Sequence, residues 1–119
     1  MTAFEAGDVV LVNYPFTDLT TTKKRPAIII CPAEYAASYQ DVVLMPLTSQ
    51  PDADASLMIS SWKAAGLSKP TWVKPLIGTL TTRLVQRKLG RLQPPDETSV
   101  HAALNIAIAD RWRLIGGPT

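Results

Sequence analysis

The sequence contains one cysteine and one histidine among its 119 residues. Because a disulfide needs two thiols, Cys31 cannot form one within the chain, and no cysteine-based zinc site can be built around it. Such cysteine usage is typical of the reducing cytoplasm, where we expect the protein to act. With His101 as the only imidazole, a ribonuclease mechanism that uses two histidines as acid and base is excluded.

Long hydrophobic runs are also missing. The longest strongly apolar stretch, residues 27–31, is far shorter than the roughly 20 residues that cross a bilayer. The N-terminus has no basic segment followed by an apolar run, so we expect no signal peptide and no membrane association. The sequence also lacks a Gly-rich phosphate loop, a paired-carboxylate motif and a plausible set of zinc ligands. We therefore expect neither a cofactor nor a metal ion.

The net charge of +2 is small, but the charged residues are unevenly distributed. Basic residues cluster at 23–25 and at 83–91, and three aspartates lie between these clusters, within residues 41–54. Clustered positive charge suits a surface that contacts phosphate groups. A solvated charged face would produce the same pattern, so both interpretations stay open at this point.

Short β-branched and apolar runs, separated by turns with proline and glycine, predict a mainly β protein. The runs cover residues 8–14, 26–31, 41–47, 57–60, 71–77 and 87–92. This pattern favours a small barrel over a parallel sheet. We expect an edge strand at 57–60, and Pro75 indicates that the run containing it lies at an edge or a bulge. No repeat or linker divides the chain, so we expect one domain over residues 1–119.

The last part of the chain changes to a helical period. Prolines and acidic residues at 94–97 are typical of a helix start, and Gly116-Gly117 of a helix end. Apolar side chains recur at helical spacing between them: Val100, Leu104, Ala107, Ile108 and Ile115. Ala103 and Ile106 widen this apolar face, so we expect it to pack against both the barrel and a second subunit. We interpret His101, at the edge of this face, as a structural residue.

Two loops carry candidate functional residues. The first, residues 15–25, is rich in threonine and then basic, and ends at Arg25. Because Pro26 restricts the backbone before it, Arg25 is expected at a fixed loop–strand junction, where its guanidinium can bind phosphate oxygens. The second loop, residues 46–51, offers two hydroxyls and an amide to a phosphate or a base edge. Each loop also has an alternative interpretation without a function. For the first loop it is a surface arginine at the start of a strand, and for the second it is a plain polar turn.

Taken together, these segments resemble the PemK/MazF-type toxins. Three stretches are similar to the opening of that family: residues 7–12, 14–18 and 24–30. Leu47-Thr48-Ser49-Gln50 resembles its second signature. Four further stretches resemble its third signature: residues 65–67, 69–71, 79–80 and 87–92. One motif alone would be a weak signal, but three in the same order identify the chain as similar to this family.

The resemblance implies an SH3-like antiparallel barrel with a C-terminal helix, acting as a homodimer. It also implies a toxin that cuts single-stranded RNA at a short sequence without a metal, and that an acidic antitoxin neutralises. Attack by the RNA's own 2′-hydroxyl would leave a 2′,3′-cyclic phosphate and a 5′-hydroxyl.

Carried over by position, the resemblance implies that Arg25 and Thr48 form the catalytic pair. It further implies a set of RNA contacts: Phe16, Thr17, Lys24, Ser49, Gln50, Lys74 and Thr79. Trp72 and Lys74 differ from the residues that the resemblance leads us to expect in their strand. This difference bears on which RNA sequence is cut more than on the reaction itself.

Two other functions are compatible with a small β barrel. One is a toxin of the same fold that inhibits DNA gyrase by binding it, as CcdB-like proteins do. The other is a non-catalytic SH3-like module that binds nucleic acid or an extended peptide. The gyrase inhibitor has no evident use for the Arg25 and Thr48 pair.

Overall fold

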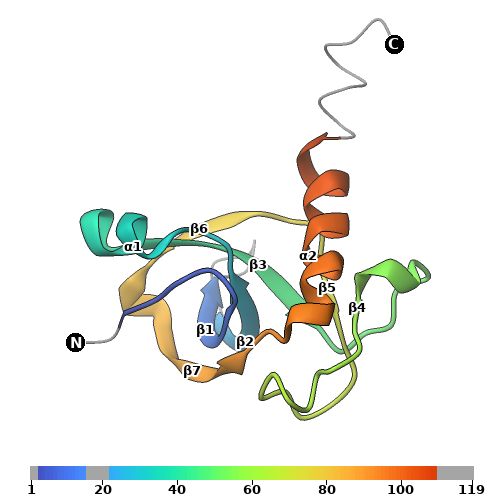
Figure 1. The fold of residues 1–119 in the computed structure, drawn as a ribbon. Coiled ribbons are helices and arrows are strands. Elements are labelled where there is room, and N and C mark those ends of the chain that lie inside the picture. The colour runs from blue at the N-terminus through green and yellow to red at the C-terminus, as the bar shows by residue number, and fades with distance from the viewer. Residues whose placement is uncertain (1–2, 16–21, 110–119) are drawn as a thin grey trace, which may run out of the picture.

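The computed structural model describes residues 3–15 and 22–109 of the chain (Figure 1). Seven strands and two α-helices follow one another in these ranges: β1 (Asp8–Pro15), β2 (Thr22–Ile29), α1 (Ala33–Tyr39), β3 (Asp41–Thr48), β4 (Met58–Ile59), β5 (Thr71–Val73), β6 (Gly78–Thr81), β7 (Val85–Arg91) and α2 (Glu97–Leu104). None of the helices in the described part is long and apolar enough to cross a membrane.

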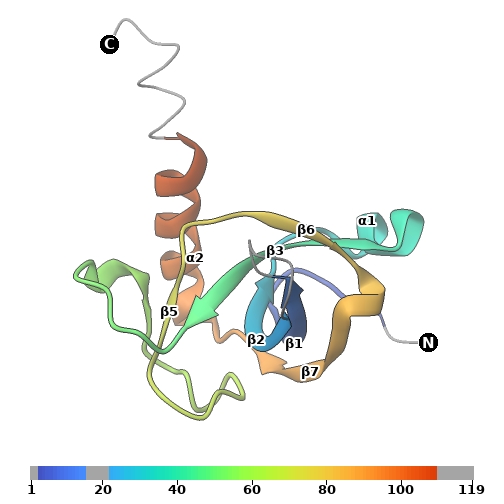
Figure 2. The same cartoon turned by 180° about the vertical axis from the view of Figure 1, so that it is seen from behind.

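The strands form one antiparallel sheet in the order β4-β5-β3-β2-β1-β7, and β6 pairs with β3 outside this path. β3 changes partners along its length, pairing with β6 through residues 41–44 and with β5 through Leu47 and Thr48. The sheet curls into a half-barrel, and α2 stands beside it (Figures 1 and 2). The prediction of a mainly β, SH3-like antiparallel barrel with a C-terminal helix is therefore confirmed.

Two apolar clusters lie on opposite faces of this sheet. Because successive side chains of a strand point to opposite faces, the run in β2 contributes to both. Ile28 packs with the cluster that includes Ala103 of α2, whereas Ala27 and Ile29 pack with the cluster that includes Ala36 of α1. β2 is therefore covered on both faces at these positions.

β2 begins at Thr22, earlier than the start at Pro26 that the sequence predicts. Its ladder with β1 extends through Val12↔Arg25 to Pro15↔Thr22, because each strand supplies hydrogen-bond partners for the other's backbone. The prediction that Arg25 lies at a loop–strand junction is therefore wrong: it lies within the strand. Thr48, also predicted on a loop, is the last residue of β3.

The run at 71–77 forms only the short strand β5. Lys74 donates its backbone N–H to the Pro46 carbonyl at 2.9 Å, and Pro75, which has no N–H, then interrupts the pairing. Pairing resumes in β6, which the sequence analysis did not predict. It also missed α1, whose seven residues are too few to show a helical period clearly.

α2 begins at Glu97, directly after a 3₁₀ turn at Pro94–Asp96, and this confirms the predicted helix start. The helix continues as a π-helical stretch over Asn105–Ala109. Ile115 and Gly116-Gly117, which we expected near its end, lie outside the described residues.

The segment between β4 and β5 is held by a buried carboxylate. Asp96 is 2% exposed and accepts hydrogen bonds from the Ser60 N–H at 3.0 Å, the Ser60 hydroxyl at 2.8 Å and the Ser61 N–H at 2.8 Å. Further along, Gly66 has a φ of +91°, and a Cβ there would lie 2.1 Å from the Leu89 carbonyl oxygen. This close approach, which only glycine permits, packs the segment against β7.

We predict that Asp96→Ala destabilises the protein by about 1–3 kcal/mol, because it removes the charged acceptor of the hydrogen bonds from Ser60 and Ser61. Chemical denaturation followed by circular dichroism measures this loss. The matched control is Glu97→Ala, whose exposed carboxylate in the first turn of α2 contributes less than about 1 kcal/mol. Equal effects of the two substitutions would contradict the structural role of Asp96.

Candidate active site

A pocket of about 260 Å³ opens where β2 and the end of β3 separate. Three walls surround it: the start of β2, the end of β3, and the segment leading into β5. Its lining residues are Lys23, Lys24, Arg25, Pro26, Leu47, Thr48, Ser49, Leu67, Ser68, Lys69 and Thr71. The pocket thus joins residues from three parts of the chain that resemble family motifs.

The register of β2 and β3 explains why Arg25 and Thr48 both line this pocket. The two strands pair from Ile29↔Leu44 to Ala27↔Pro46, where their described ladder ends. Continued by two residues, this register would bring Arg25 and Thr48 to matching positions on one face of the sheet. Beyond Pro46 the two strands separate and leave the pocket between them, while the other edge of β3 pairs with β5.

Thr48 is oriented by the turn that follows it. Its hydroxyl oxygen accepts a hydrogen bond from the Gln50 N–H at 3.0 Å, in the manner of a threonine turn. Since a hydroxyl carries one donor and two acceptor sites, its proton can still be donated to an anion in the pocket. The same turn places Ser49 on the pocket wall.

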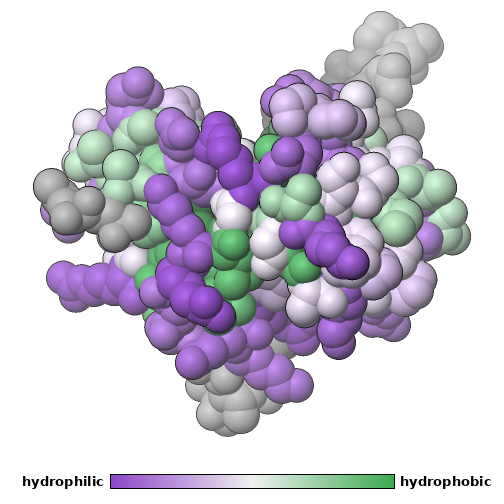
Figure 3. Space-filling view, turned by 60° about the horizontal axis from the view of Figure 1, so that its bottom comes forward, coloured by the Kyte–Doolittle hydropathy of each residue, from purple (hydrophilic) through white to green (hydrophobic). Residues whose placement is uncertain are grey.

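The charged side chains in the described lining of the pocket are all basic. Lys23, Lys24, Arg25 and Lys69 line it, and none of the described lining residues is acidic. Figure 3 brings the lower side of Figure 1 forward and shows hydrophilic side chains over much of that side, beside apolar patches. Positive charge around a concave site favours an anionic group such as a phosphate.

The described residues contain no group of three or more His, Cys, Asp or Glu side chains that could hold a metal ion. The chemistry open to the pocket is therefore hydrogen bonding by a guanidinium, ammonium groups and hydroxyls.

The structure brings together four of the residues that the sequence analysis assigned to the site: Lys24, Arg25, Thr48 and Ser49. Gln50 adjoins the pocket through its hydrogen bond to Thr48. Lys74 and Thr79 do not line it. Thr79 pairs with Val43 in the first half of β3, away from Thr48 at its end.

Phe16 and Thr17 lie outside the described residues, so their part in the site stays a prediction. The third wall, with Leu67, Ser68 and Lys69, was missed as part of the site. The Lys69-Pro70 pair gave no signal for it, since the same argument from Arg25-Pro26 predicted the wrong start of β2.

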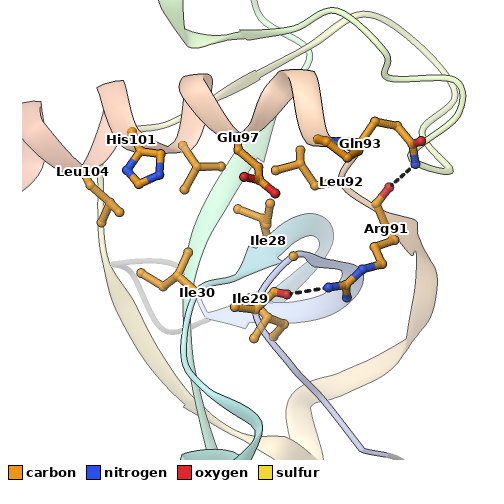
Figure 4. Close-up of a pocket in the computed structure, with 13 residues that line it drawn as sticks. Ile28, Ile29, Ile30, Arg91, Leu92, Gln93, Glu97, His101 and Leu104 are labelled. Carbon is orange, nitrogen blue, oxygen red and sulfur yellow. Dashed lines mark hydrogen bonds between the residues drawn. The ribbon is translucent and has the colours of Figure 1, made fainter.

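A second, larger pocket of about 530 Å³ lies between α2 and β2 (Figure 4). Ile28 of β2 and Ile30, just after that strand, lie on one side of the pocket, and Glu97 and His101 extend into it from α2. This pocket does not contain Arg25 or Thr48, so His101 is not part of the site that they line.

Comparison with known proteins identifies a family and a fold. The family model of the PemK-like, MazF-like toxin of type II toxin–antitoxin systems matches residues 5–108. None of the curated proteins matches the chain in sequence.

Among solved structures, the chain is similar to the toxin MazF-mt6 of Mycobacterium tuberculosis, with a TM-score of 0.69, 18% identity, and coverage of 86% of this chain and 96% of that one. An endoribonuclease from a mycobacterial species, in complex with its cognate antitoxin, has a TM-score of 0.68, 20% identity and coverage of 92% and 96%. A MazE–MazF complex from Deinococcus radiodurans has a TM-score of 0.70, 18% identity and coverage of 91% and 98%. At these identities the likeness shows a shared fold.

Proposed function

Because the chain belongs to the family of PemK-like, MazF-like toxins of type II toxin–antitoxin systems, we propose that it cuts single-stranded RNA without a metal ion. The observation that carries the proposal is a basic pocket that both Arg25 and Thr48 line. The motif resemblance assigns the catalytic roles to these two residues, and their common position in the pocket supports that assignment.

The reaction needs few groups from the protein. The RNA's 2′-hydroxyl attacks the adjacent phosphorus, and the bond to the 5′-oxygen breaks, leaving a 2′,3′-cyclic phosphate and a 5′-hydroxyl. Negative charge increases on the phosphate oxygens in the transition state. Arg25 stabilises this charge through preorganised hydrogen bonds, and the Thr48 hydroxyl donates to a phosphate oxygen. DNA has no 2′-hydroxyl and is not a substrate.

The remaining predicted RNA contacts differ in their position relative to the pocket. Lys24, Ser49 and Gln50 lie in or beside the pocket and bind the nucleotides at the cleavage site. Lys74 and Thr79 lie outside it and contact nucleotides farther along the strand. Phe16 and Thr17 belong to the connection between β1 and β2, which precedes the basic residues of the pocket.

The partner of the toxin is an acidic antitoxin. Complexes of similar structures with an antitoxin or with MazE support this part of the proposal. A segment that carries Asp and Glu side chains fits the charge of the pocket, and its occupation of the pocket would exclude RNA.

The second pocket supports a homodimer. Ile30 and the α2 residues Val100 and Leu104 line it and are only partly buried in the single chain. The helix also exposes Ile106 to 38% and Ile108 to 50%. A second copy of the chain would cover these surfaces, as the wide apolar face of the helix predicts.

We predict cleavage of a long single-stranded RNA at a limited set of positions in the presence of a chelator, with cyclic phosphate ends. Gel electrophoresis and end mapping measure the products. Duplex RNA resists, because its stacked bases cannot be splayed into a pocket. Activity that a chelator abolishes and magnesium restores would contradict the mechanism, and an RNA that stays intact would favour a gyrase inhibitor or a binding module.

We predict that Arg25→Ala and Thr48→Ala each lower the cleavage rate by on the order of a hundredfold, because each removes one preorganised donor. Thr48→Ser, which keeps the hydroxyl, retains most of the activity. His101→Ala is the control outside the pocket and is nearly as active as the parent. Cleavage by folded Arg25→Ala within about threefold of the parent rate would overturn the assignment.

We predict that light scattering gives twice the chain mass of 12.9 kDa at micromolar concentration. Ile108→Glu weakens the dimer by placing a charge on the apolar end of the helix. Tyr39→Glu, at a 67% exposed position on α1, is the matched control and leaves the mass unchanged. A monomeric parent would contradict the assignment of this surface.

A further inference from the structure

Lys69 is the one basic residue of the described pocket lining that does not come from β2. Lys23, Lys24 and Arg25 follow one another on that strand, whereas Lys69 belongs to the wall formed by the segment before β5. Positive charge therefore approaches the pocket from two walls. A phosphate in the pocket would lie between Arg25 and Lys69.

The backbone at Lys69 is held on its N-terminal side. Leu67 is 8% exposed, packs in the cluster beneath α2, and donates its N–H to the Trp62 carbonyl at 3.0 Å. Before it, Gly66 lies against β7, and Asp96 binds the backbone of Ser60 and Ser61. Lys69 thus follows a segment that the core and a buried carboxylate anchor.

The backbone at Lys69 is also held on its C-terminal side. Pro70 restricts the backbone conformation of Lys69. Thr71 is 3% exposed, pairs with Ile59, and donates its hydroxyl to the Lys69 carbonyl at 2.8 Å. A cation whose backbone is fixed on both sides loses less conformational entropy when it binds an anion, so little of its binding energy is spent on ordering.

Lys69 has no carboxylate partner in the described part of the chain, where Lys88 and Arg91 both bind Asp8. Those two basic residues connect β7 to the start of β1. Lys69 is exposed and makes no such connection. Its charge is available for a ligand rather than used in the fold.

We propose that Lys69 is a substrate-binding residue that holds an RNA phosphate in the pocket from the wall facing β2. The inference rests on the proposed function and adds a contact from a third part of the chain. As a compact point charge, the ammonium group binds phosphate oxygens without reading the bases.

The test measures binding of a single-stranded RNA that carries a 2′-deoxy group at the cleavage site, over a range of salt concentrations. Lys69→Ala weakens binding by about tenfold at low salt and reduces the slope of log K against log salt by roughly 0.7, the value for one phosphate contact on a single strand. With cleavable RNA, KM rises by a similar factor and kcat changes less than about threefold. Lys69→Arg restores both the affinity and the salt slope.

Lys63→Ala is the matched control. Lys63 is exposed in the same segment and lies over the Trp62 ring at 5.6 Å, but it does not line the pocket. This variant keeps the parent affinity and slope. If Lys69→Ala does not fold, Lys69→Gln replaces it, with the same expectations.

The outcomes separate the two proposals. A parent that neither binds nor cuts the RNA overturns the proposed function and, with it, the assignment of Lys69. A parent that cuts, beside a folded Lys69→Ala with unchanged affinity and salt slope, overturns the assignment of Lys69 alone. A parallel loss in Lys63→Ala would mean that general surface charge accounts for the effect, and this also overturns it.

Discussion

The register between β2 and β3 is the constraint on which the site depends. The two strands pair as far as Ala27↔Pro46, where their described ladder ends. Because a strand has two edges, β3 continues beyond this point in its pairing with β5, and β2 continues in its pairing with β1. Each strand is thus held on its far side while the two separate, and Arg25 and Thr48 line the pocket between them.

The third wall depends on packing far from the pocket. The segment from Ser60 to Lys69 lies between β4 and β5 and is not part of either strand. Its position instead follows from the carboxylate of Asp96 at the start of α2 and from the close approach of Gly66 to β7. The turn that leads into the C-terminal helix therefore contributes to the candidate active site without lining it, because its Asp96 anchors the segment that carries Lys69.

Basic residues in this chain have two different physical roles. In the second basic cluster, Lys88 and Arg91 are partners of Asp8, a carboxylate that is only 5% exposed. A buried carboxylate needs such partners, so these cations contribute to the stability of the barrel. In the first cluster, Lys24 and Arg25 line a pocket without acidic residues among its described lining. Both clusters look alike in sequence, and only the structure shows that Lys88 and Arg91 are partners of a buried carboxylate.

Local patterns in the sequence were enough to predict the short strands, the antiparallel barrel and the helix start after Pro95, because alternation and helix-start signals act between near neighbours. The similarity of three motifs also indicated Arg25 and Thr48. The start of β2 at Thr22, the strand β6 and the place of Lys69 in the pocket were decided by tertiary structure alone. The first two depend on which distant strand is present for their backbone to pair with, and the third depends on the distant carboxylate that anchors its segment. No local pattern in the chain specifies such partners.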